Sequence, residues 1–397
     1  METTDAFVGL ECDDCGAVVD AEAGSHRCPD CAGWLEPTYD YDAIDLDRET
    51  LADRSFDSQW RYAELLPFPR EAAVTTNEGA TPLVDCPQLA AELGVDRVFV
   101  KDESRNPTGT SKDRGASVAV TAAALCGATD VALPSTGNGG QAVAAYAGRA
   151  GLDAHAYLPS RSGFTNKAMV NVHGGDMNVV GGRFDEAVGA FEEGLAEHDD
   201  WYSLRAFETP YRHEGAKTLF YEIAEQLEWA VPDVIAYPTG TGTGLVGLAK
   251  AATELEELGL IADLPALYAA QVSGCAPIVE AVDDDRDEHE PVEHPDTICG
   301  ELEIPDPAAS PRVLDAIRET DGGAIATDDP DVLEAAVRVA QATGLEMSPS
   351  AAASASGAWE LAERGTFDGD ETIVIVNTGS GNKEADVLRS HLMGQGI

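Results

Sequence analysis

From about residue 95 onwards, short apolar runs alternate with longer alanine-rich stretches. The apolar runs predict strands at 98–100, 131–133, 154–158, 178–180, 234–237, 267–270 and 372–376. Helices are predicted between most of them, over 113–125, 140–150, 184–197, 214–228 and 244–258. This alternation is typical of parallel sheets covered by helices. In such folds, functional residues gather in the loops at the carboxyl ends of the strands.

The first residues follow a different pattern, with two C-x2-C pairs at Cys12/Cys15 and Cys28/Cys31. This spacing predicts a tetrahedral site of four thiolates, and a structural zinc ion is the favoured occupant. Disulfides and a rubredoxin-like iron site are the alternatives, and His26 is close enough in sequence to compete as a ligand. Four thiolates leave no open coordination position, so we expect a structural role.

The length of 397 residues predicts two or three domains. Residues 1–36 form the expected zinc ribbon, and residues 37–75 are interpreted as an arm or linker because they mix aromatic residues with prolines. Residues 76–397 then contain the alternating region. No run approaches the roughly 20 apolar residues that a membrane span needs. The first five residues are neither basic nor apolar, so we expect no signal peptide and a cytoplasmic protein.

The charge is strongly negative, with 72 acidic against 25 basic residues and a net charge of -47. Asp and Glu are spread along the whole chain, which is typical of halophilic proteins whose self-repulsion is screened by salt. A merely acidic protein is the alternative. A field of this sign argues against nucleic acid as a partner.

Lysine is rare, and each of the few lysines is a candidate for chemistry that Arg cannot perform. They are Lys101, Lys112, Lys167, Lys217, Lys250 and Lys383. Lys112 ends a glycine-containing turn, 106–111, and begins a predicted helix. The helix dipole there lowers the pKa of an amine, as a Schiff-base-forming lysine requires. A surface lysine in a loop is the alternative for this turn taken alone.

Two further loops follow predicted strands and precede predicted helices. Residues 238–244 (Pro-Thr-Gly-Thr-Gly-Thr-Gly) offer backbone N–H groups beside a helix N-terminus, which is a phosphate-binding arrangement. The loop lacks both the GxGxxG spacing of dinucleotide sites and the lysine of a P-loop. Residues 135–141 (Ser-Thr-Gly-Asn-Gly-Gly-Gln) place an amide where a phenolate or a carboxylate could be held. Each loop alone is a weak signal.

Together, these loops resemble those of the fold-type II pyridoxal-phosphate (PLP) enzymes, and most closely the threonine synthases. The similarity covers residues 78 to 383. It is carried by Glu78-Gly-Ala-Thr-Pro-Leu83, Lys101-Asp-Glu103, the loop 106–115, Arg212-His-Glu-Gly-Ala-Lys-Thr218 and Thr378-Gly-Ser-Gly-Asn-Lys383. Several threonine synthases also carry an N-terminal zinc ribbon. The resemblance implies a tryptophan synthase β-like fold of two three-layer α/β domains plus the ribbon. A smaller mobile domain, roughly 115–205, would be inserted in the larger one.

The resemblance also implies roles for individual residues. Lys112 would carry PLP as a Schiff base and move protons, Asn138 would hydrogen-bond the cofactor's O3′, and Thr378 would face the pyridine nitrogen. The 5′-phosphate would be held by Gly240, Thr241, Gly242, Thr243 and Gly244. Ser135 and Thr136 would bind the substrate carboxylate. Relatives of this fold are commonly dimers, so a homodimer is expected.

The substrate is less closely specified, because the sequence departs from the family pattern around it. Thr110-Ser111 replaces Ser-Phe, Gln141 is typical of serine and threonine dehydratases, and 347–351 replaces a Glu-containing motif. An anionic substrate is favoured by four basic residues in or near the matched loops, namely Arg161, Lys167, Arg212 and Lys217. The alternative is that Arg212 and Lys217 pair with local carboxylates such as Glu208 and Glu214.

Three functions follow from these observations. The first is conversion of the small-molecule amino acid O-phosphohomoserine, with water, to threonine and phosphate. The second is a serine/threonine dehydratase or a β-replacement synthase of the cysteate synthase type. The third, a degenerate binding scaffold, is disfavoured because Lys112, Asn138 and Thr378 are all present.

Overall fold

The structure is a computed structural model that describes residues 1–21 and 27–394, so His26 lies outside the described residues. The chain divides into two compact units. Unit 1 comprises 1–80, 112–219 and 257–260, and unit 2 comprises 81–111, 220–256 and 261–397. The chain therefore passes from unit 2 into unit 1 between Ser111 and Lys112.

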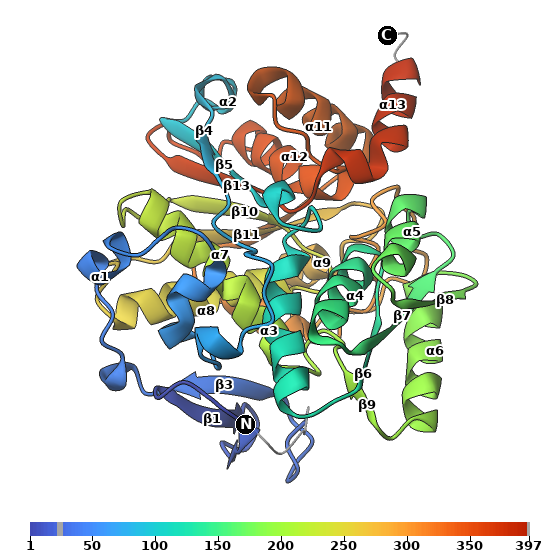
Figure 1. Cartoon of the computed structure of the whole chain (residues 1–397). Helices are drawn as coiled ribbons and strands as arrows, with labels where there is room; N and C mark the ends of the chain where they lie inside the picture. The colour runs from blue at the N-terminus through green and yellow to red at the C-terminus, as the bar shows by residue number, and fades with distance from the viewer. Residues whose placement is uncertain (22–26, 395–397) are drawn as a thin grey trace. The chain divides into compact units, whose positions relative to one another are not determined.

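Unit 1 contains a four-stranded parallel sheet of order β8-β7-β6-β9. Its strands are β6 (Asp130–Pro134), β7 (Asp153–Pro159), β8 (Asp176–Val180) and β9 (Trp201–Ser203). Its helices are α3 (Lys112–Leu125), α4 (Asn138–Ala150), α5 (Phe164–Val172) and α6 (Phe184–Glu197). Right-handed crossovers put α4 and α5 on one face and α6, which returns across the sheet, on the other (Figure 1).

The N-terminal ribbon belongs to unit 1 and shares its core. Strands β1 (Phe7–Cys12), β2 (Val18–Val19) and β3 (Leu35–Tyr39) form an antiparallel sheet of order β2-β1-β3. The buried side chains of Leu10 and Leu35 belong to the same apolar cluster as those of α3 and α4. The ribbon is therefore packed into the hydrophobic core of this unit.

The segment 37–75, interpreted from sequence as an arm or linker, is also packed into unit 1. It contains α1 (Arg48–Ala52) and the 3₁₀ turns at 41–43, 59–65 and 70–72. Trp60 and Phe68 are at most 1% exposed. The indole N–H of Trp60 lies 2.9 Å from both a Glu78 carboxylate oxygen and the Ser117 hydroxyl. The aromatic residues of this segment thus fill the core.

Unit 2 contains a six-stranded sheet of order β12-β11-β10-β13-β5-β4. Its strands are β4 (Leu83–Asp85), β5 (Arg97–Asp102), β10 (Val234–Pro238), β11 (Ala266–Val272), β12 (Gly323–Thr327) and β13 (Thr372–Asn377). All pairs are parallel except β4 with β5. The helices are α2 (Pro87–Leu93), α8 (Thr243–Glu257), α9 (Pro277–Asp283), α10 (Ser310–Glu319), α11 (Asp329–Thr343), α12 (Pro349–Glu363) and α13 (Ala385–Gly394). Helix α7 (Tyr211–Gln226) belongs to unit 1 as far as Leu219 and to unit 2 thereafter.

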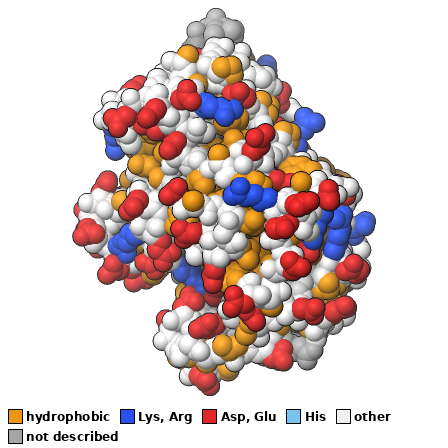
Figure 2. Space-filling view, turned by 90° about the vertical axis from the view of Figure 1, so that its left-hand side faces the viewer, with side chains coloured by type: hydrophobic (Ala, Val, Ile, Leu, Met, Phe, Trp, Pro, Cys, Tyr) orange, Lys and Arg blue, Asp and Glu red, His pale blue; other side chains and the backbone are white. Residues whose placement is uncertain are grey.

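All seven predicted strands and all five predicted helices are present, which confirms the α/β prediction. Strands β4 and β9, which are three residues long, and β12, whose Gly-Ala-Ile-Ala-Thr sequence has no extended apolar run, were not predicted. Within 1–21 and 27–394, no helix combines the length and the apolar character needed to cross a bilayer. The face drawn in Figure 2 carries many dispersed acidic side chains and few basic ones.

Helices α3 and α7 cross within unit 1 with their backbones in direct contact. A Cβ added at Gly115 would lie 2.6 Å from the Arg212 carbonyl oxygen, and one added at Gly215 would strike the Arg114 carbonyl. Glycine is required at both positions because the opposing atoms are backbone atoms that cannot rotate away.

We predict that Gly215→Ala lowers the free energy of unfolding by about 2–3 kcal/mol, because the added methyl must separate the two helices. Gly189→Ala is the matched control, since Gly189 lies exposed in α6 and a Cβ there meets no neighbour within 4 Å. That change should stabilise the protein by about 0.5–1 kcal/mol through helix propensity. Denaturant unfolding measures both, and equal effects would contradict the close crossing.

Candidate functional site

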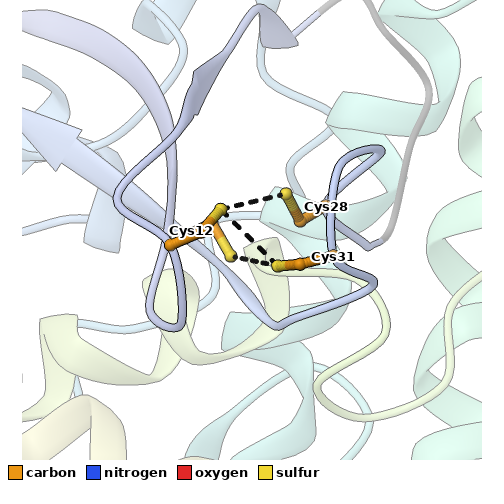
Figure 3. Close-up of side chains that lie close together, drawn as sticks. Cys12, Cys28 and Cys31 are labelled. Carbon is orange, nitrogen blue, oxygen red and sulfur yellow. Dashed lines mark hydrogen bonds between the residues drawn. The ribbon is translucent and has the colours of Figure 1, made fainter.

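The four N-terminal cysteines converge as their spacing predicted. Their sulfur atoms all lie within 4.8 Å of one another, with Cys12–Cys31 at 3.4 Å, Cys15–Cys31 at 3.5 Å and Cys15–Cys28 at 3.6 Å. Figure 3 shows the sulfurs of Cys12, Cys28 and Cys31 pointing toward one another. A tetrahedral zinc ion with 2.3 Å bonds would space its sulfur ligands about 3.8 Å apart, so the arrangement fits a zinc ion.

Two similar turns shape this cluster. The Gly16 N–H donates to the Cys12 carbonyl (2.9 Å), and the Ala32 N–H donates to the Cys28 carbonyl (2.8 Å). A Cβ at Gly33 would lie 2.8 Å from the Cys12 sulfur, so a larger residue would intrude on the thiolates. Each turn therefore directs its two sulfurs inward, as a closed structural metal site requires.

In unit 1, the loop 135–137 connects β6 to the N-terminus of α4. The Ser135 hydroxyl accepts hydrogen bonds from the N–H groups of Gly137 (3.0 Å) and Gly140 (2.8 Å). Asn138 is buried at the first position of α4, and Thr136 is partly exposed. This geometry places Ser135, Thr136 and Asn138 together at the carboxyl end of a parallel strand, where binding residues gather.

Arg212, near the start of α7, lies beside the same helix terminus. Its guanidinium donates to the Leu204 carbonyl (3.1 Å), and its second terminal nitrogen lies 3.3 Å from the position that a Gly139 Cβ would occupy. Burial lowers the pKa of Arg212 to about 10, so the group is still charged at neutral pH. An anion at this position would be attracted both by the Arg212 guanidinium and by the N-terminus of α4, a helix of 13 residues.

Lys217 lies in a different environment from Arg212. It is fully buried and forms an ion pair of 2.7 Å with Glu214, which is also fully buried. Its ammonium lies 4.3 Å from the centre of the Tyr39 ring, and the Tyr39 hydroxyl donates to Glu214. Lys217 therefore has the local pairing that the sequence analysis kept as an alternative. The corresponding pairing of Arg212 with Glu208 is not the arrangement found, because Glu208 contacts Arg205 at 3.1 Å.

In unit 2, the glycine-rich loop 238–244 connects β10 to α8. Neighbouring atoms approach each glycine closely: a Cβ at Gly240 would lie 2.9 Å from the Glu301 carbonyl oxygen, and Cβ atoms at Gly242 and Gly244 would collide with the side chains of Val313 and Tyr237. Gly242 also has a φ of 87°. Thr241 and Thr243 bring their hydroxyls within 3.5 Å of each other at the start of α8. Backbone N–H groups at a helix N-terminus, together with two hydroxyls, fit a phosphate group.

The turn before Lys112 is bonded to the loop after β13. The Ser111 N–H donates to the Thr378 carbonyl (3.0 Å), and the Ser380 N–H donates to the Gly109 carbonyl (3.0 Å), both within unit 2. Lys112 is the next residue of the chain and the first of α3. Lys112 is thus one peptide bond away from Ser111, whose N–H donates to the Thr378 carbonyl.

A buried polar network around Lys101 was not predicted from the sequence. The Lys101 ammonium contacts Glu222 (2.7 Å), the Thr81 carbonyl (2.8 Å) and Gln226 (2.8 Å), and Lys101 and Glu222 have no exposed surface. The Thr81 hydroxyl also donates to Glu103 (2.5 Å). Lys101 and Glu103 were matched to the family motif, but nothing in the sequence marked Glu222 on α7 as the partner.

Comparisons with known proteins show the family to which the chain belongs. The family model for "Pyridoxal-phosphate dependent enzyme" matches residues 74–379. A threonine synthase of Methanosarcina acetivorans is 37% identical over 371 residues, covering 93% of this chain and 91% of that protein. A threonine synthase of Methanocaldococcus jannaschii is 37% identical over 379 residues, covering 94% and 93%. The chain belongs to the threonine synthase family of PLP-dependent enzymes.

Solved structures extend the similarity of this threonine synthase family member to more distant proteins. A diaminopropionate ammonia lyase from Escherichia coli matches 85% of this chain and 93% of its own, with a TM-score of 0.70 and 18% identity. An L-serine ammonia-lyase from Rhizomucor miehei matches 78% and 97%, with a TM-score of 0.68 and 21% identity. At these identities the match shows the fold, which is that of the fold-type II PLP enzymes.

Glu384, directly after the matched C-terminal motif, provides a test by pH. Burial and the nearby charge of Glu301 raise its pKa to about 7, while Lys383 opposes the shift. A carboxyl group with a raised pKa in the folded state contributes stability below its unfolded pKa, and that contribution is lost as the pH rises toward 7. Removing the charge with Glu384→Gln should therefore stabilise the protein at pH 8 by about 2 kcal/mol and have little effect near pH 4.5.

Denaturant unfolding at the two pH values measures this difference. Asp386→Asn is the matched control, because Asp386 is exposed two residues later. A stabilisation of Glu384→Gln that is independent of pH would contradict the raised pKa.

Proposed function

We propose that this protein converts O-phosphohomoserine and water to threonine and phosphate. The observation that carries the proposal is the 37% identity to threonine synthases over more than nine-tenths of both chains. The position of Arg212 beside the N-terminus of α4 supports it, because this arrangement suits an anionic substrate group.

PLP, when bound, supplies an electron sink that stabilises negative charge on the substrate carbons. In the proposal, Lys112 would hold the cofactor covalently and, once released by substrate, would move protons to and from the substrate carbons. The loop Gly240, Thr241, Gly242, Thr243 and Gly244 would hold the 5′-phosphate, Asn138 would hydrogen-bond O3′ and Thr378 would face the pyridine nitrogen. A hydroxyl there does not force that nitrogen to stay protonated, which suits elimination and replacement.

Substrate binding is assigned to the residues around α4. Ser135 and Thr136 would bind the substrate carboxylate, and Arg212 would bind its phosphate and stabilise the charge that develops on the leaving group. Lys217 was assigned the same role, but its charge is neutralised by Glu214 at 2.7 Å. We therefore give Arg212 the main part, and Lys217 would reach substrate only if that pair opened.

A dehydratase or β-replacement activity is the second candidate. Gln141, buried in the first turn of α4, favours it, since the sequence resembles dehydratases at this position. The position of Arg212 argues against the dehydratase, because the hydroxyl leaving group of serine or threonine carries no charge for a guanidinium to bind. A β-replacement synthase that takes a phosphorylated or sulfonated amino acid would suit Arg212 as well, and the 37% identity to threonine synthases is what places it second.

We predict that the protein, incubated with PLP at high salt, releases phosphate and threonine from O-phosphohomoserine in equal amounts. Lys112→Ala should reduce the rate by at least about a thousandfold, because it removes both the attachment and the proton carrier. Its visible cofactor absorbance should be lost as well. Phosphate and threonine are assayed in the same reaction.

The control is Lys250→Ala, which removes another of the rare lysines, from within α8. It should keep both the colour and the activity. A coloured, folded wild type that releases no phosphate but deaminates serine or threonine would replace the first function with the second.

We also propose that the four cysteines bind a structural zinc ion. Metal analysis should find about one zinc per chain, and Cys28→Ser with Cys31→Ser should abolish it and lower the melting temperature. Cys126→Ser is the control, because Cys126 is exposed and lies in the connection between α3 and β6, outside the cysteine cluster. Iron in place of zinc, or full stability of the double variant, would contradict the proposal.

The cellular setting is part of the same proposal. The net charge of -47 supports a protein adapted to a salt-rich cytoplasm, since salt screens self-repulsion of this size. A homodimer is proposed by analogy with other enzymes of the fold.

A further inference from the structure

The ribbon strand β3 contacts the first turn of α7 through two of its side chains. The Glu36 carboxylate lies 2.8 Å from the Nε2 of His213, and His213 is fully buried. Three residues along the strand, the Tyr39 hydroxyl donates to the buried Glu214 carboxylate. Both contacts lie within unit 1.

Glu36, Tyr39, His213, Glu214 and Lys217 form a network of contacts that we call the brace. Its cation is a protein group, the ammonium of Lys217. Glu36, His213 and Glu214 bring their ligand atoms within 4.8 Å of one another, which alone would allow a metal ion. Lys217 already supplies the cation, because its buried ammonium lies 2.7 Å from Glu214 and beneath the Tyr39 ring. A second cation at this position would be repelled by that ammonium.

The brace holds the residues that directly follow Arg212. Glu214 and Lys217 fix one side of α7, while the close contact of Gly215 with Arg114 fixes another. The neighbouring ribbon residue Trp34 also packs edge-on against Phe207, at 6.3 Å between ring centres. The Arg212 side chain itself is held by the Leu204 carbonyl at 3.1 Å. Its direction therefore depends on a helix start that the ribbon helps to fix.

We propose that strand β3 of the ribbon is a positioning element for the anion-binding guanidinium of Arg212. Glu36 and Tyr39 are positioning residues that act through His213 and Glu214 and do not themselves touch substrate. This inference rests on the proposed role of Arg212 in binding the substrate phosphate. It gives the ribbon a part in substrate affinity in addition to any metal-dependent stability.

The test uses inorganic phosphate, the proposed product, as a competitive inhibitor of the PLP-loaded protein. Tyr39→Phe keeps the ring over Lys217 but removes the hydrogen bond to Glu214, and it should raise the inhibition constant for phosphate roughly tenfold. Glu36→Gln, at the partly exposed end of the brace, should raise it in the same direction by a smaller factor. The visible spectrum of the bound cofactor should not change in either variant.

Glu11→Gln is the matched control. Glu11 is the register partner of Glu36 on β1 and is exposed, so the substitution removes the same charge from the ribbon without touching α7. It should leave the inhibition constant unchanged. If Tyr39→Phe fails to fold, Glu36→Gln carries the test.

A double-mutant cycle separates this proposal from the one on which it rests. Arg212→Gln should itself weaken phosphate inhibition, and adding Tyr39→Phe or Glu36→Gln should then have no further effect. If Arg212→Gln leaves phosphate inhibition unchanged, the phosphate-binding role of Arg212 is wrong. If Arg212→Gln weakens inhibition but the β3 variants do not, or if their effects add independently, the positioning role is overturned.

Discussion

The structure of unit 1 depends on the need to pair the polar residues that α7 carries into the protein interior. Buried charges and hydrogen-bonding groups are costly unless each has a partner. Within the Arg212–Thr218 motif, Lys217 pairs with Glu214 on the same helix and Tyr39 completes that pair from the ribbon. The Thr218 hydroxyl accepts a hydrogen bond from Arg114 (3.0 Å) and donates one to Gln59 (3.0 Å). The ribbon, the segment 37–75 and α3 are therefore connected through one helix.

The same motif contains Gly215, which has a different role. With no side chain, it lets α7 touch the backbone of α3 two and three residues after Lys112. The motif thus combines a close helix crossing, a buried ion pair and, at Arg212, a charge directed toward the N-terminus of α4. In unit 2, the glycines at 240, 242 and 244 likewise let neighbouring segments approach the loop proposed to hold a phosphate.

Much of the fold followed from the sequence, because buried parallel strands are short apolar runs between helices, a pattern that local composition reveals. The cysteine cluster also followed from spacing alone, since two C-x2-C turns close on themselves with little help from the rest of the chain. The loops at 106–115, 135–141 and 238–244 were found because glycine marks close approach and because their combination matches a family.

Long-range pairing could not be predicted in this way. Glu214 accepts a hydrogen bond from Tyr39, which is 175 residues away in the sequence. Lys101 pairs with Glu222, which is 121 residues away. Residues 37–75 were interpreted as an arm or linker because they mix aromatic residues with prolines, yet Trp60 is buried against Glu78 and Ser117. In each case the tertiary contact, which local sequence does not encode, decides the environment of the residue.

The most direct test of the account is to identify the lysine that carries PLP. Borohydride reduction of the PLP-loaded protein, followed by peptide mapping by mass spectrometry, fixes the cofactor to its lysine and locates it. We expect the label on the peptide containing Lys112. A label on Lys101, Lys167, Lys217, Lys250 or Lys383, or on none of the six, would contradict it.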